Sequence, residues 1–170
     1  MKMSTEPIRK RIFVRKDVIL SRIGMQINLV ARARGNNGVP DSTLNVVEQY
    51  EDMLVELINK YYSKAESRMA AYIEKEKRYS QMDYPKDWEE RTIYLTMPYY
   101  WKEETFENLA SSINDYIVNA VVAEYFALIY TSKDPLTVDR LNLADEAFAD
   151  IKHYCLTSKP HSIKKKLHPF

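Results

Sequence analysis

The stretch TFENLASSINDYIVNAVVAEYFALIYT, residues 105–131, decides the fold class of this chain. Its apolar residues return every three or four positions along the whole stretch, which is the spacing of one face of an α-helix. Because the apolar stripe is wide, the segment is predicted to be the central core helix of a helical protein. The positions predicted to be buried are Phe106, Leu109, Ala110, Ile113, Ile117, Ala120, Val121, Tyr125, Leu128 and Ile129.

A second helix is predicted directly after this one. Asp134 is followed by Pro135, which combines an N-cap residue with proline at the first helical position. The helix is expected to run to about residue 157. Its predicted buried residues are Leu141, Ala144, Phe148, Ile151 and Cys155.

Two more helices are predicted before the central one. Asp17 is the expected N-cap of a helix over 18–33, with Val18, Ile19, Ile23, Ile27, Val30 and Ala31 near one face. The Gly- and Asn-containing turn at 35–40 then breaks the chain. Asp41 or Ser42 caps the next helix, which is either continuous to about residue 73 or broken near Ser63 and Lys64. Its predicted apolar positions are Leu44, Val47, Tyr50, Leu54, Leu57, Ile58, Tyr61, Ala65, Met69, Tyr72 and Ile73.

Two short stretches have the character of β-strands. Residues 11–14 are β-prone, and residues 91–98 are predicted to be extended. Because a lone strand has little stability, the two are expected to pair as a small two-stranded element. The sequence therefore predicts an all-α bundle of about four main helices with a minor β element. We expect a basic N-terminal arm over 1–16, a helical domain over 17–158 and a basic tail over 159–170.

Charge is divided unevenly along the 170 residues. Residues 1–34 carry nine Lys/Arg and two acids, a net charge of +7, and residues 152–170 carry five Lys and no acid, a net charge of +5. The middle, 35–151, carries 11 bases and 22 acids, a net charge of −11. Basic ends around an acidic body indicate a protein that joins other macromolecules, including copies of itself.

The sequence offers no set of residues suited to catalysis. Glu146, Asp150 and His153 share one helix at spacings that resemble half of a carboxylate–histidine metal site, but no second helix supplies the other half. We interpret them as a solvated helix face. Cys155 lies two residues from His153, on a different helical face, and is predicted to be a core thiol. We therefore expect no enzyme activity, no metal and no cofactor.

Localisation follows from what the sequence lacks. The first residues contain no signal-peptide core, and no apolar run approaches the roughly 18 residues of a membrane span. The single cysteine excludes a disulfide within the chain. We expect an intracellular product that makes no membrane contact.

The basic ends have two possible partners, and the remaining alternative is that they are simply solvated. They are suited to phosphates of a nucleic acid, and equally to the acidic body of a neighbouring copy. The apolar residues near the C-terminus favour a protein partner, because a terminal aromatic residue beside a leucine is a good anchor for a pocket. The predicted partner-binding residues are Arg9, Lys10, Arg11, Arg15, Lys164, Lys165, Lys166, Leu167 and Phe170.

Over roughly residues 44–158 the layout resembles the small helical head–tail connector (head completion or neck ring) proteins of tailed bacteriophages. The resemblance lies in the helix with Tyr61-Tyr62 and Ala65, the extended 93–98 segment with aromatic residues 99–101, and two helices before a basic tail. It implies a structural virion protein, assembled in the host cytoplasm, that forms an oligomeric ring between portal and tail. The implied partners are copies of itself, portal, tail or other neck proteins. The alternative is a helical nucleic-acid-binding protein that places its basic termini on phosphates.

Overall fold

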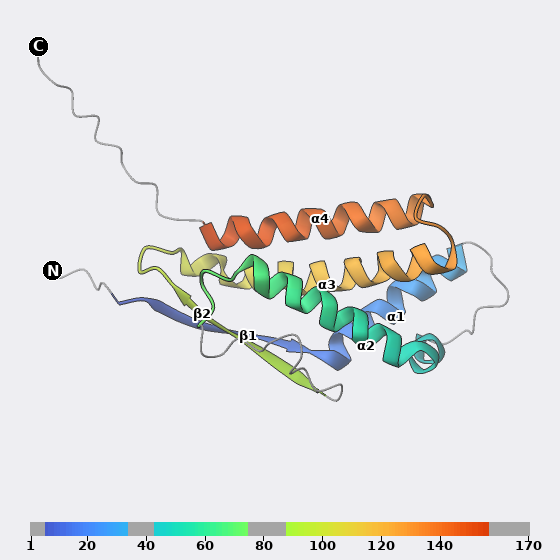
Figure 1. Cartoon of the computed structure of the whole chain (residues 1–170), viewed down its shortest axis with the longest axis horizontal. Helices are drawn as coiled ribbons and strands as arrows, with labels where there is room; N and C mark the ends of the chain where they lie inside the picture. Colours follow the sequence, from blue (N-terminus) through green and yellow to red (C-terminus); the bar gives the residue numbers. More distant parts are fainter. Residues whose placement is uncertain (1–5, 34–42, 75–87, 157–170) are drawn as a thin grey trace, which may run out of the picture.

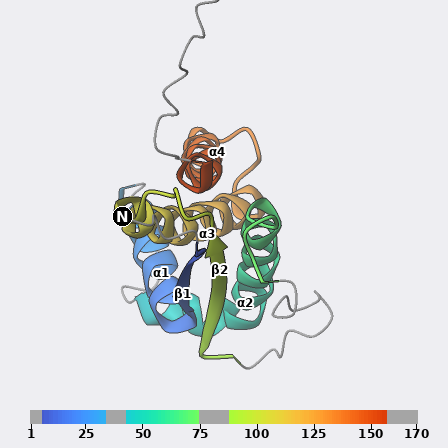
Figure 2. The ribbon, with the colours of Figure 1, turned by 90° about the vertical axis from the view of Figure 1, so that its left-hand side faces the viewer.

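The computed structural model describes residues 6–33, 43–74 and 88–156. The elements in chain order are β1 (Ile8–Arg15), α1 (Lys16–Ala33), α2 (Thr43–Arg68), β2 (Glu90–Met97), the short 3-10 helix η2 (Glu103–Thr105), α3 (Phe106–Ile129) and α4 (Pro135–Leu156). Figures 1 and 2 show three layers, with α4 outermost, α3 in the middle, and α1, the two strands and α2 side by side beneath α3. The described chain is thus mostly helical, with four main helices and a small sheet, as predicted.

The central helix α3 occupies the predicted position. Most of its predicted residues are buried, with Ile113, Ile117 and Val121 fully inaccessible, but Phe106 and Ala110 are only half-buried. The prediction is wrong for Leu128 and Ile129, whose side chains are 66% and 50% exposed. Periodicity identifies one side of a helix but not whether a neighbour reaches its last turn, and here the described neighbours leave that turn uncovered.

Helix α4 begins as predicted. The backbone amide of Leu136 donates a 3.0 Å hydrogen bond to Oδ1 of Asp134, which confirms the cap. The inner side of α4 carries small residues that let it lie close against α3, and the buried residues of α4 are Thr137, Ala144, Ala147, Ile151 and Cys155. Leu141 is 42% exposed rather than buried. Because α4 packs mainly on α3, the described residues cover only one side of it.

The first two helices differ from prediction at their ends. Helix α1 begins at Lys16, so Asp17 lies in its first turn and is not its N-cap. Val18 is 45% exposed, and Leu20 is buried in its place. Helix α2 ends at Arg68, and its kink lies at Tyr50, where φ is −123° and ψ is 18°, rather than near 63–64.

The two predicted extended stretches form one antiparallel sheet. Ile12 lies opposite Ile93 in the register of β1 and β2, which confirms the predicted pairing. Because side chains alternate between the two faces of a strand, Ile12, Val14, Ile93, Leu95 and Met97 all enter the core. Residues 8–15 of the segment expected as an arm therefore belong to β1.

The far edge of β2 is also paired. The chain after α2 turns back so that the Thr96 amide donates to the Tyr72 carbonyl at 2.7 Å, and Ile73 bridges to Leu95. This explains why α2 stops before the predicted residue 73: residues 72–74 bond to the sheet instead. Among the described residues, no backbone group outside β2 bonds to β1, so β1 forms the open edge.

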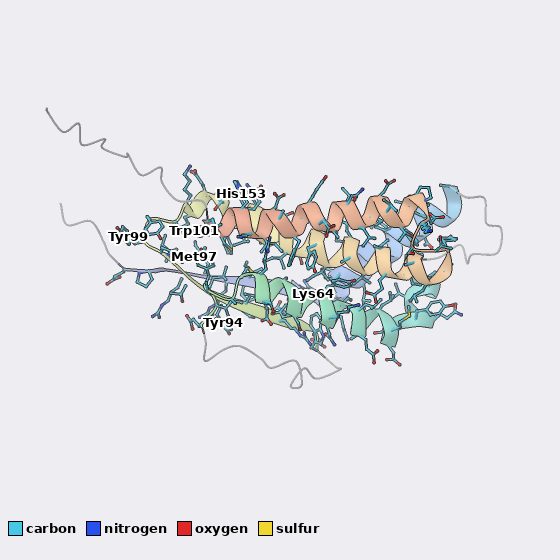
Figure 3. All side chains as sticks on the ribbon, turned by 45° about the horizontal axis from the view of Figure 1, so that its top comes forward. Lys64, Tyr94, Met97, Tyr99, Trp101 and His153 are labelled. Carbon is cyan, nitrogen blue, oxygen red and sulfur yellow. The ribbon has the colours of Figure 1, made fainter. Side chains whose placement is uncertain are left out.

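Aromatic residues gather where β2 ends. Trp101 is buried, and its Nε1 donates a 2.8 Å hydrogen bond to the carbonyl oxygen of Tyr154 in α4. Tyr99 is 54% exposed at this end of the molecule (Figure 3). In the part of the chain that the structure describes, no helix is both long and apolar enough to cross a membrane.

Candidate protein-docking surface

Strand β1 divides the predicted N-terminal basic cluster between its two faces. Arg9, Arg11 and Arg15 are exposed on one face, and Ile12 and Val14 point the other way into the core. The alternation of the pleated strand also places Phe13 on the arginine face, where it is 54% exposed. A benzyl side chain this accessible, between arginines, is suited to contact with another macromolecule.

Lys10 lies on the opposite face of the strand from its two arginine neighbours. Its ammonium forms an ion pair with Glu103 of η2 and lies 5.4 Å from the ring centre of Phe106. Glu103 lies in η2, directly before α3, and Phe106 is the first residue of α3, so Lys10 helps to hold β1 against the start of that helix. Of the four predicted N-terminal contact residues, the structure therefore brings together Arg9, Arg11 and Arg15, and separates Lys10 from them.

Strand β2 completes the outward face. Tyr94 lies opposite Arg11 in the register, and the Arg11 guanidinium carbon is 5.4 Å from the Tyr94 ring centre, within cation–π range. Figure 3 shows Tyr94 on the side of the sheet away from α4. We call this surface the basic sheet face. It consists of Arg9, Arg11, Phe13, Arg15 and Tyr94.

Acidic neighbours lie at one end of the basic sheet face. Arg15 donates a 2.7 Å hydrogen bond to Oδ2 of Asp17 and lies opposite Glu90 in the register. No ion pair between described residues involves Arg9 or Arg11. Among the described residues, the positive charge of this face that has no ion-pair partner is therefore concentrated at the Arg9–Arg11 end.

That end contains a shallow open recess of about 380 Å³. Its lining residues are Arg9, Lys10, Arg11, Glu74, Tyr94 and Leu95. Its polar side-chain groups are the guanidinium groups of Arg9 and Arg11, the carboxylate of Glu74 and the phenol of Tyr94, because the ammonium of Lys10 is paired with Glu103 on the opposite face. The described lining contains no second acid beside Glu74. The recess is therefore suited to holding an anionic or acidic group rather than to carrying out chemistry on it.

A second exposed surface lies on α4, beyond α3 from the sheet. Asp139, Leu143, Glu146 and Asp150 follow one another at i, i+4, i+7 and i+11, so they form a line along the helix. All four are exposed, with Leu143 at 44%. We call this line the acidic α4 face. Glu146 and Asp150 were predicted to belong to a solvated helix face, but the line that they form with Asp139 and Leu143 was not predicted.

The residues weighed for metal binding and catalysis lie on different sides of α4. His153 is exposed, whereas Cys155 is buried, and burial raises the pKa of the Cys155 thiol to about 12. Among residues 6–33, 43–74 and 88–156, no three His, Cys, Asp or Glu side chains are grouped so as to hold a metal ion.

The C-terminal half of the predicted contact set falls outside the described residues. It consists of Lys164, Lys165, Lys166, Leu167 and Phe170. Sequence reasoning also missed Phe13 and Tyr94 as surface residues. The signal for Phe13 was the alternation Arg-x-Arg-x-Phe-x-Arg over residues 9–15, which places all four side chains on one face of a strand.

Comparison with protein-family models, curated proteins and solved structures finds no match to this chain.

Proposed function

We propose that this protein is a structural subunit that assembles with copies of itself and docks through the basic sheet face and its C-terminal tail. The observation that carries the proposal is the exposure of Arg9, Arg11 and Phe13 side by side on one strand. The opposite face of that strand is fixed in the core through Ile12 and Val14, so the contact residues are held in place before any partner arrives. Preorganisation of this kind reduces the entropy lost on association.

The finer proposal is a head–tail connector of a tailed phage, a ring between portal and tail. It rests on the resemblance of residues 44–158 to such connectors. The four main helices, the small β element and the aromatic residues at the end of β2 are compatible with that layout. In this proposal the protein is part of the virion, and its role is adhesion rather than catalysis.

The test is the mass of the purified full chain without nucleic acid. Light scattering across a concentration series, with electron microscopy of the same sample, is expected to show closed oligomers at physiological salt. The arginines contribute electrostatically, so the oligomers should weaken as salt rises. A chain that remains monomeric at high micromolar concentration and low salt would contradict the proposal.

A second candidate function is nucleic-acid binding. The observation that favours it is the contact of Arg11 with the Tyr94 ring on the same face as the exposed Phe13, because single-stranded nucleic acid binds to stacking rings beside basic side chains. A shift assay with single-stranded DNA separates the two candidates. Lys133, an exposed base at the turn between α3 and α4, provides the control. This function would be favoured if Arg11→Glu abolishes DNA binding and Lys133→Glu does not.

A further inference from the structure

We infer that the acidic α4 face of a second copy is the partner of the basic sheet face. This inference rests on the proposed assembly function and names the surface that each copy presents. It requires the two faces to be complementary in charge, to match in the order of their side chains, and to be unable to meet within one chain. Each requirement has support in the described residues.

The acidic α4 face carries charge that no other described residue neutralises through an ion pair. No ion pair between described residues involves Asp139, Glu146 or Asp150. The guanidinium of Arg140 is half-buried and donates to Oδ1 of Asn119 at 3.2 Å. Lys152 is exposed, but helical spacing places it on the other flank of α4. The face is therefore a negative surface available to an external cation.

The order of side chains on the two faces is the same. Along β1 the face reads basic, basic, apolar, basic, through Arg9, Arg11, Phe13 and Arg15. Along α4 from its C-terminal end it reads acidic, acidic, apolar, acidic, through Asp150, Glu146, Leu143 and Asp139. Laid antiparallel, every arginine meets a carboxylate, and Phe13 meets Leu143.

The lengths of the two rows agree closely enough for this pairing. Six strand residues separate Arg9 from Arg15, a span of about 20 Å at about 3.3 Å per residue. Eleven helical residues separate Asp139 from Asp150, a span of about 16 Å at 1.5 Å per residue. The difference of about 4 Å can be taken up by three long, flexible arginine side chains. The apolar residues match in position, because Phe13 lies roughly two-thirds of the way from Arg9 to Arg15 and Leu143 roughly two-thirds of the way from Asp150 to Asp139.

The faces cannot meet within one molecule, because α3 lies between α4 and the sheet (Figure 2). A contact between two different faces is heterologous, so each copy offers one face and accepts the other. Heterologous contacts produce rings when the rotation between copies closes. The inferred contact is therefore compatible with the proposed ring, and a rotation that does not close would give an open filament instead.

Cysteine cross-linking of mixed variants tests the contact directly. Phe13→Cys and Leu143→Cys are made in separate full-length chains, and Cys155 stays out of the reaction because it is only 4% exposed. Under mild oxidation the mixture is expected to give a disulfide-linked dimer. Neither variant is expected to do so alone. Glu56→Cys, at an exposed position on α2, is the matched control and should not link to Phe13→Cys.

The outcomes separate this inference from the proposed function. If the chains assemble but the mixture does not cross-link, the inference is wrong and the assembly function stands. If Phe13→Cys links to itself, a two-fold contact replaces the heterologous one. If the chain never assembles, both the inference and the proposed function fail.

A charge exchange provides an independent measurement. Arg11→Glu or Glu146→Arg alone is expected to raise the dissociation constant of the assembly about tenfold or more, because close charge pairs at interfaces are strongly coupled. The double variant R11E/E146R should recover most of the loss. Lys133→Glu and Glu56→Arg are the matched controls, because they reverse a charge at an exposed position outside both faces. If the dissociation constant of the double variant rises by the product of the two single-variant factors, Arg11 and Glu146 do not contact each other.

Discussion

The hydroxyl of Tyr61 donates a 2.6 Å hydrogen bond to Oε2 of Glu124, and this bond joins α2 to α3. The ammonium of Lys60 reaches both oxygens of the same carboxylate, at 2.8 and 2.7 Å. Burial acts to raise the pKa of Glu124, but the hydrogen bonds from Lys60 and Tyr61 and the charges of Lys60 and Lys64 lower it below its ordinary value of 4.5. The ionised form of Glu124 is therefore the one that the fold prefers.

This arrangement predicts a pH-dependent contribution to stability. Because the folded pKa of Glu124 lies below the unfolded one, the contribution is complete above pH 4.5 and is lost as pH falls through the folded pKa. Glu124→Gln should reduce the free energy of unfolding by about 1 kcal/mol at pH 7, since the pair is partly exposed. Urea denaturation of the original chain and of Glu124→Gln at pH 7, 5 and 3 should show that the difference in their free energies of unfolding becomes smaller as the pH falls. Glu56→Gln is the exposed control, and a difference independent of pH would refute the argument.

Truncation of Ile12 and truncation of Phe13, which are neighbours in β1, are predicted to affect different properties: the first mainly stability, the second mainly assembly. Ile12 is 2% exposed, so Ile12→Ala should lower the free energy of unfolding by about 2–4 kcal/mol through cavity formation. Phe13→Ala removes a side chain that is 54% exposed and should cost less than about 1 kcal/mol, while weakening assembly. Denaturation and light scattering measure the two effects. Equal destabilisation by both changes would mean that β1 does not hold these residues on opposite faces.

The two-stranded sheet shows which features of this fold could be predicted from the sequence and which could not. The β-prone character of residues 11–14 and 91–98 was enough to predict their pairing, because neither strand is stable alone. The pattern did not predict that the side chain of Lys10 lies on the opposite face of β1 from those of Arg9 and Arg11. Three consecutive bases look like one charged surface in a sequence, but the two-residue period of a strand assigns the middle one to the other face.

The helices show the corresponding limit for periodicity. Apolar spacing predicted burial for Ile113, Leu128 and Leu141 alike, but only Ile113 is inaccessible, and the two leucines are exposed. A helical period identifies a side of the helix, whereas burial depends on which other elements reach that side. The kink at Tyr50 had no glycine or proline to mark it. The proposal that β1 contacts α4 of a second copy likewise depends on knowing which residues of β1 face outward.

Cys155 is predicted to be inert toward thiol reagents in the folded protein. Burial raises the pKa of its thiol from 9.0 to about 12, and only the thiolate is nucleophilic. At pH 8 the thiolate fraction is then about 1,000-fold smaller than that of an unperturbed thiol, and the 4% exposure limits access further. The rate of reaction with a chromogenic disulfide should rise sharply when urea unfolds the chain. Rapid labelling of the native protein would contradict this placement.

Removal of residues 159–170 is predicted to weaken assembly and leave the helical domain intact. Helix α4 ends at Leu156 and its last buried residue is Cys155, so the truncation removes no residue of the described core. Circular dichroism and the melting temperature should therefore match those of the full chain within about 2 °C. Assembly should weaken because four lysines and the apolar pair Leu167 and Phe170 are lost. Replacing Lys164, Lys165 and Lys166 with glutamine in one variant, and Leu167 and Phe170 with alanine in another, separates charge from apolar anchoring. If the truncated chain assembles like the full chain at physiological salt, the tail has no part in docking.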